Sequence, residues 1–217
     1  MKLLNIVKKN IIKLYGKKDA HLIYNGVPAP NLIQTTHYLD KLGVEPQKYI
    51  FAMGRFVPEK NFHQLIKVFS SLDNSDGYKL VLAGDADFDD EYSRELKKIA
   101  CENEVVLTGF IRGEKLHELL TYASAFVLPS LHEGLPISLL EAMSYDLPVI
   151  VSDIPANLAI GLPSDSYFPV GNEEKLREKL RDLIDKKPNK RKYPLEKYQW
   201  DNIAKQTIKV YEKLNIK

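Results

Sequence analysis

From Lys48 onward, the chain alternates short apolar runs with longer amphipathic stretches. Runs such as KLVLA and AFVL are continuously apolar, which is typical of strands covered on both faces. The stretches between them place apolar residues at helical spacing. We predict strands at Tyr49–Ala52, Lys79–Ala83, Val105–Leu107, Ala125–Leu128, Val149–Val151 and Tyr167–Pro169. We predict helices near Phe62–Leu72, Tyr92–Glu102, Leu116–Tyr122, Ile137–Tyr145 and Glu173–Ile184.

This alternation predicts the fold class. Strands joined by helices of this length return in the same direction through right-handed crossovers, which gives a parallel sheet. We therefore expect an α/β fold, a Rossmann-like parallel sheet of about six strands with helices on both faces.

The two ends of the chain lie outside this repeat. Residues 1–18 carry six Lys and no acidic residue, and their apolar residues share one helical face. Such a helix could lie on a membrane surface, but we favour the closing helix of another domain. We predict a short strand at His21–Tyr24, followed by an Asn25-Gly26 turn. KKPNKRK at 186–192 is interpreted as a solvated basic loop and Tyr198–Leu214 as a final helix.

Composition narrows the class of protein. The 217 residues are 44% apolar and 28% charged, the balance of an ordinary globular domain with one core. The net charge of +2 is too small to indicate a nucleic-acid binder. One cysteine excludes an internal disulfide and fits a reducing compartment. No apolar run approaches the roughly 20 residues of a membrane span, and the first residues lack a secretory signal, so we expect a cytoplasmic protein.

Ligands of open parallel sheets bind at the carboxyl ends of the strands. The first strand is followed by GRFVPEKN at 54–61, in which Gly54 permits close approach and Arg55 and Lys60 supply two cations. Because helix N-termini also favour anions, this turn suits a diphosphate. Taken alone, it could equally be a solvated basic loop.

A second candidate loop follows the fourth strand. Pro136 is expected at the first position of a helix, and free N–H groups near Gly134–Ile137 could receive phosphate oxygens. Glu141 follows Pro136 by about 7 Å along the helix axis. Glu133 and Glu141 could therefore accept hydroxyl groups on either side of a bound diphosphate. Alternatively, Glu133 only faces the helix dipole and Glu141 only faces solvent.

These loops carry a family resemblance. Glu133 and Glu141, set in HEGLPISLLEAM, resemble the signature of the family 4 glycosyltransferases, which have the two-domain GT-B fold. GRFVPEKN is similar to the phosphate-binding loop of that family. LAGD at 82–85, LTGF at 107–110 and LPVI at 147–150 are similar too, in the same order. The ordered set covers about residues 48–185.

The resemblance implies a role for each matching position. Arg55 and Lys60 would bind the donor pyrophosphate and stabilise the leaving group, while Glu133 would hold hydroxyls of the donor sugar. Glu141 would hold the ribose. Backbone groups near Gly109 would contact the base, and those of Gly134 would contact phosphate or sugar. The implied catalytic set is Glu133, Arg55 and Lys60; the implied donor-binding set is Gly54, Gly84, Gly109, Phe110, Ile111, Gly134, Leu135, Pro136 and Glu141.

The resemblance also implies an activity. Members transfer a sugar, here expected to be a hexose, from a nucleoside-diphosphate sugar such as a UDP- or GDP-sugar with retention of configuration. They generally need no metal, and we expect no cofactor. The acceptor would be a glycan or a lipid-linked sugar in the synthesis of a surface polysaccharide such as lipopolysaccharide.

Two departures from the family stand out. After the fifth strand, SDIPAN at 152–157 replaces a Gly-Gly pair and a later Glu. The family's amino-terminal domain, which carries most of the acceptor site, has no counterpart in this sequence. By analogy, residues 1–28 would be its remnant and the interdomain crossing, residues 29–190 the nucleotide-sugar-binding domain, and residues 191–217 a helix returning to the other domain. We expect this chain alone to be inactive, because nothing in it positions an acceptor.

Other interpretations stay open. The run DADFDD at 85–90 has the Asp-x-Asp spacing of metal-dependent transferases, but we favour a loop that caps the helix beginning near Glu91. A non-catalytic nucleotide-sugar-binding fragment that needs a partner polypeptide is an alternative function. So is a sugar-nucleotide epimerase or hydrolase of the same fold. Residues 1–18 and 186–192 could contact anionic lipid and place the protein at the inner face of the membrane.

Overall fold

A computed structural model describes residues 12–16, 21–72, 77–187 and 189–215. These residues form a six-stranded sheet of order β3-β2-β1-β4-β5-β6, in which all neighbours are parallel. The six predicted strands are confirmed, each within one residue of its predicted ends. The strands are β1 (Tyr49–Met53), β2 (Lys79–Ala83), β3 (Val106–Leu107), β4 (Ala125–Leu128), β5 (Val149–Ser152) and β6 (Tyr167–Phe168).

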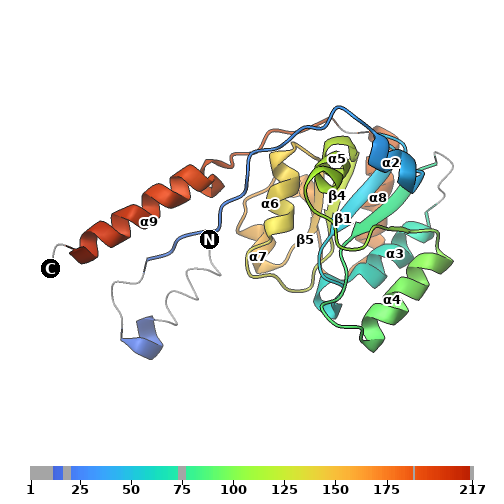
Figure 1. Ribbon diagram of the computed structural model, residues 1–217. Helices are drawn as coiled ribbons and strands as arrows, with labels where there is room; N and C mark the ends of the chain where they lie inside the picture. The colour runs from blue at the N-terminus through green and yellow to red at the C-terminus, as the bar shows by residue number, and fades with distance from the viewer. Residues whose placement is uncertain (1–11, 17–20, 73–76, 188, 216–217) are drawn as a thin grey trace.

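Helices cover both faces of the sheet (Figure 1). Successive residues of β1 alternate between two buried clusters: Phe51 packs with residues of α2, α5 and α6, and Ile50 packs with residues of α3, α4 and α8. Because both faces are covered, β1 is buried at all five positions. The α/β, Rossmann-like prediction is therefore confirmed. The helices are α2 (His37–Leu42), α3 (Phe62–Ser70), α4 (Glu91–Glu102), α5 (Glu114–Tyr122), α6 (Ile137–Ser144), α7 (Pro155–Leu158), α8 (Glu173–Lys186) and α9 (Trp200–Asn215).

Helix α2 was not predicted, because six residues are too few for a periodic pattern. Its start is held from elsewhere in the chain. Glu118 of α5 is buried, and its Oε1 accepts the backbone N–H groups of Tyr38 at 2.7 Å and Leu39 at 2.8 Å. A carboxylate at a helix N-terminus satisfies donors that have no partner within the helix.

The prediction of a strand at His21–Tyr24 and a turn at Asn25-Gly26 is wrong. Residues 21–26 lie outside the sheet. The residue that follows them, Val27, forms an isolated bridge with Gln199. The direction of this segment is set by packing against the start of α9. A Cβ at Gly26 would lie 2.5 Å from the Trp200 ring, so glycine is needed there for close approach and not for a turn.

The ends of the chain agree in part with the predictions. Residues 12–15 are helical, and the other residues of the predicted helix at 1–18 lie outside the described residues, except Gly16. The final helix is confirmed as α9, which extends away from the body of the domain (Figure 1). Its Trp200, Ile208 and Tyr211 are all more than half exposed. None of the described helices is long and apolar enough to cross a membrane.

The turns after β1, β2 and β3 are packed tightly against one another. Gly54 donates its N–H to the carbonyl of Ala83 at 3.0 Å, and Gly84 donates to the carbonyl of Gly109 at 2.9 Å. Gly84 has a φ of +135°, and a Cβ there would lie 1.9 Å from the carbonyl oxygen of Gly54. Only glycine fits at this position, and its lack of a side chain allows the turns after β1 and β2 to approach this closely.

We expect Gly84→Ala to destabilise the domain by about 2–4 kcal/mol, because it combines a disfavoured φ with a clash between backbones. Urea unfolding measures this change. Gly161→Ala is the control, since Gly161 also has a positive φ, +82°, but a Cβ there meets nothing within 4 Å. Equal losses for the two variants would show that the close approach contributes nothing.

Candidate functional site

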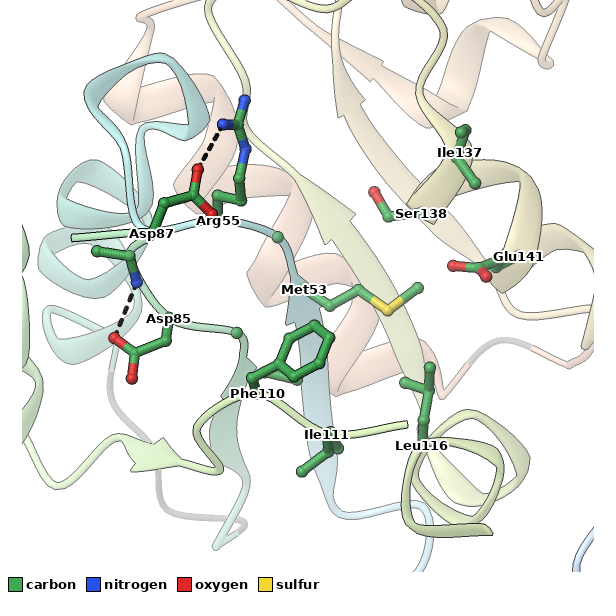
Figure 2. Close-up of a pocket in the computed structure, with 14 residues that line it drawn as sticks. Met53, Arg55, Asp85, Asp87, Phe110, Ile111, Leu116, Ile137, Ser138 and Glu141 are labelled. Atoms are coloured by element: carbon green, nitrogen blue, oxygen red, sulfur yellow. Dashed lines mark hydrogen bonds and ion pairs between the residues drawn. The ribbon is translucent and has the colours of Figure 1, made fainter. Parts of the chain in front are cut away.

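A cavity of about 590 Å³ opens at the carboxyl edge of the sheet. The turns after β1, β2 and β3 form one side, and α6, which follows β4, forms the other (Figure 2). β1 and β4 are neighbours from which the chain proceeds in opposite directions across the sheet. Ligands of open α/β sheets bind at this topological switch point, and the volume suits a small ligand such as a nucleotide.

The structure brings half of the predicted site residues into the wall of this cavity. Those that line it are Gly54, Arg55, Gly84, Phe110, Ile111 and Glu141. Those that do not are Lys60, Gly109, Glu133, Gly134, Leu135 and Pro136. Residues outside the predicted catalytic and donor-binding sets complete the wall, among them Met53, Asp85, Asp87, Leu116, Ile137 and Ser138.

One end of the cavity is apolar. The Phe110 ring is 70% exposed and lies beside Met53, with Ile111 and Leu116 close by (Figure 2). The guanidinium of Arg112 lies 4.8 Å from the centre of the Phe110 ring. An exposed aromatic face in a cavity wall offers a stacking surface for a flat ligand group.

Arg55 lies at the polar end, where it already has an anionic partner. Its Nη1 is 2.8 Å from Oδ2 of Asp87, and both side chains are more than half exposed. The hydrogen bond to Asp87 and the charge of that carboxylate raise the pKa of Arg55, with smaller contributions from Glu59 and Glu133. Because exposed ion pairs are weak, a phosphate can replace Asp87 as the partner of this guanidinium.

Glu141 faces the cavity from α6, across from Arg55 (Figure 2). Burial raises the pKa of its carboxyl group. None of the ion pairs among the described residues includes Glu141. A half-buried carboxylate without a counter-ion, facing a cavity, is a frequent feature of functional sites.

Lys60 and Glu133 form an ion pair beside the cavity. Nζ and Oε1 are 2.6 Å apart, and the two side chains are 16% and 8% exposed. Ser130 donates its hydroxyl to the same Glu133 oxygen at 2.8 Å. The Lys60 stem lies against Gly54, where a Cβ would be 3.3 Å from Lys60 Cε. The pair therefore adjoins the wall at Gly54 without lining the cavity.

The start of α6 differs from the prediction in two ways. Pro136 precedes the first helical residue instead of occupying that position. The N–H of Ile137 donates to the carbonyl of Leu135 at 2.9 Å, so it is not free for a phosphate. The chain closes a tight turn over Pro136, and this turn uses a donor that an open helix start would leave unpaired.

The carboxylates of the acidic run DADFDD pair with nearby basic side chains or cap a helix. Asp85 lies 2.7 Å from Lys97, Asp87 pairs with Arg55, and Asp89 lies 3.1 Å from Arg94. The hydrogen bond from Lys97 lowers the pKa of Asp85. Asp90 accepts the N–H of Ser93, and this confirms the predicted cap of α4. Within the described residues, no group of three or more His, Cys, Asp or Glu could hold a metal ion.

Comparison with known proteins identifies the family. Residues 34–200 match the family described as Glycosyl transferases group 1. The chain belongs to this family.

The similar proteins are longer than this glycosyltransferase chain. It is 30% identical to an uncharacterized glycosyltransferase of Methanocaldococcus jannaschii, over 95% of this chain and 57% of the relative. It is 32% identical to the O-antigen chain mannosyltransferase RfbU of Salmonella typhimurium, over 69% of this chain and 40% of that protein. The chain thus spans about half the length, or less, of these relatives.

Solved structures show the same fold. A glycosyltransferase from Rickettsia africae matches with a TM-score of 0.77 at 16% identity, over 96% of this chain and 61% of that one. Anabaena HepE in complex with UDP matches with a TM-score of 0.74 at 18% identity, over 98% of this chain and 62% of that one. The predicted resemblance to one half of a GT-B glycosyltransferase is confirmed.

We expect Lys60→Met to destabilise the glycosyltransferase domain by about 2 kcal/mol, because it leaves the Glu133 carboxylate largely buried without its cation. Lys67→Met is the matched control: Lys67 pairs with Glu173 at 2.9 Å, but its side chain is 68% exposed. That change should cost less than about 1 kcal/mol. Urea unfolding of both variants decides the point, and equal losses would contradict the structural importance of the Lys60–Glu133 pair.

Proposed function

We propose that this chain is the donor-binding domain of a retaining glycosyltransferase. It would bind a nucleoside-diphosphate sugar, and the hexose would pass to a glycan or lipid-linked acceptor. The observation that carries the proposal is the cavity at the switch point, where an apolar end, Arg55 and Glu141 surround one space. A nucleoside diphosphate has the matching sequence of groups: a flat base, a ribose and an anionic diphosphate.

The cavity suggests one orientation for the donor. The base would lie at the apolar end, against Phe110 and Ile111. The ribose hydroxyls would donate to Glu141, and the diphosphate would lie toward Arg55 and Lys60. The sugar would then reach Glu133, which lies beyond Gly54. Support for donor binding, though not for one orientation, comes from the similar fold of Anabaena HepE, which was solved with UDP and with UDP-glucose.

Catalysis would depend on neutralising the leaving group. Cleavage of the bond between the sugar and the diphosphate proceeds through an oxocarbenium-like transition state and leaves negative charge on the diphosphate. Arg55 and Lys60 would stabilise that charge more strongly than the ground state, which is how cations accelerate the step. With two cations in this role, we propose that no metal or cofactor is required.

The acceptor would bind elsewhere. Because the chain spans 57% of the Methanocaldococcus relative, we propose that an amino-terminal domain, in cis or in trans, supplies the acceptor site. This chain alone would then bind donor without transferring sugar. The same partial coverage favours a second candidate, a non-catalytic nucleotide-sugar-binding fragment. Sugar transfer by this chain alone, given a sugar donor and candidate acceptors, would exclude the fragment.

We expect Arg55→Ala and Glu141→Ala each to weaken UDP or GDP binding about tenfold, because each removes a charged hydrogen-bond partner of the nucleotide. Isothermal titration calorimetry measures the dissociation constants. Arg94→Ala is the control, since Arg94 forms a comparable exposed ion pair with Asp89 but does not line the cavity. A folded wild-type sample that binds neither nucleotide would refute the donor-binding proposal.

The pH dependence of UDP binding should report Glu141. Its raised pKa means that the carboxyl gains a proton at a higher pH than an exposed glutamate would. Once protonated, it accepts ribose hydroxyls poorly, so UDP affinity should fall as the pH falls through this raised pKa. Glu141→Gln has no such titration. The phosphate of UDP titrates equally with both proteins, so the difference between them isolates Glu141, and identical profiles would contradict its role.

A further inference from the structure

A chain of buried hydrogen bonds runs beneath Glu133. Its Oε1 accepts the hydroxyl of Ser130 at 2.8 Å, and the Ser130 carbonyl in turn accepts the hydroxyl of Ser152 at 2.5 Å. Asn157 then donates its Nδ2 to the carbonyl of Ser152 at 2.9 Å and to its hydroxyl oxygen at 3.2 Å. The loop after β4, the end of β5 and helix α7 are thereby connected to a single carboxylate oxygen.

These groups lie in the interior of the protein. Ser130, Ser152 and Asn157 have no exposed surface, and Glu133 has little. Oδ1 of Asn157 is buried without a hydrogen-bond partner among the described residues. Burial of this unpaired oxygen is unfavourable, whereas Nδ2 of the same side chain donates to the buried Ser152. Within the described residues, the hydrogen bonds of the Asn157 side chain therefore all go to Ser152 through Nδ2.

The two oxygens of Glu133 have different surroundings. Oε1 accepts from both Lys60 and Ser130, at 2.6 and 2.8 Å. Oε2 receives no hydrogen bond from any residue that the structure describes. Fixing one oxygen sets the rotamer of the whole carboxylate, so Oε2 is held in one place and keeps its capacity to accept hydroxyl groups.

We propose that Asn157 is a positioning residue that acts through Ser152 and Ser130 to orient Glu133 toward the hydroxyls of the donor sugar. This inference rests on the proposed donor-binding function. It gives a role to the segment SDIPAN at 152–157, where the sequence departs from the family pattern. Asn157 does not touch the ligand itself, and its effect on the ligand is confined to the sugar.

The test compares two ligands on the full 217-residue chain. In the wild type and in Glu133→Gln, calorimetry with UDP, GDP, UDP-glucose, UDP-galactose and GDP-mannose identifies a donor whose binding depends on Glu133. Asn157→Ala should then weaken that donor about fivefold and leave the matching nucleoside diphosphate within a factor of two. A merely structural role would weaken both ligands alike.

A double-mutant cycle tests the route through Glu133. If Asn157 acts on that carboxylate, adding Asn157→Ala to Glu133→Gln should change donor affinity by less than a factor of two. A further fivefold loss in the double variant would overturn the proposal. Ser152→Ala removes one oxygen of the same chain and repeats the test should Asn157→Ala not fold.

Ser124→Ala is the matched control. Ser124 is also buried, and it donates to the carbonyl of Tyr49 at 2.6 Å at the opposite edge of the sheet. It should leave the ratio of donor to nucleotide affinity unchanged. A wild-type chain that binds no nucleotide would contradict the proposed function itself. Nucleotide binding with no donor sensitive to Glu133, or with no effect of Asn157, would overturn only the positioning role.

Discussion

The ion pair between Lys60 and Glu133 joins the two loops on which the site depends. Lys60 follows β1 and Glu133 follows β4, and these strands are neighbours at the switch point of the sheet. A second contact, from the N–H of Leu131 to the carbonyl of Glu59 at 2.8 Å, holds the same loops together. Each of these poorly solvated charges would be costly to bury alone, so the two side chains stay paired. The pair therefore holds the two loops together next to the cavity wall at Gly54.

Much of the fold follows from local pattern. A run such as AFVL at 125–128 predicts a buried strand, because continuously apolar residues need cover on both faces of a sheet. His21–Tyr24 has similar residues but no strand to pair with, and local sequence does not contain that information. The start of α2 depends on Glu118, which lies about 80 residues away. The sequence therefore predicts the strands and helices of the repeating unit well. It predicts poorly those segments whose structure depends on a contact with a distant part of the chain.

The site was predictable to the extent that it depends on strand ends. Arg55 and Glu141 follow from the rule that ligands meet the carboxyl edge of a parallel sheet. The partner of Arg55 did not follow: Asp87 belongs to an acidic run whose clearest local role is to cap α4. Asn157 was not singled out, because the sequence around it does not indicate that its side chain contacts the end of β5. The link from Ser152 to Ser130, and so to Glu133, exists only because β4 and β5 are adjacent.

The charges around the cavity constrain how a diphosphate can enter. Its wall holds one arginine and three carboxylates, a balance that would repel an anion if every group were free. Lys97 neutralises Asp85 from outside the wall, and Glu141 lies across the cavity from Arg55. Asp87 is the acid of this wall that pairs directly with Arg55. In the proposed orientation, a bound diphosphate would therefore displace Asp87 as the partner of Arg55.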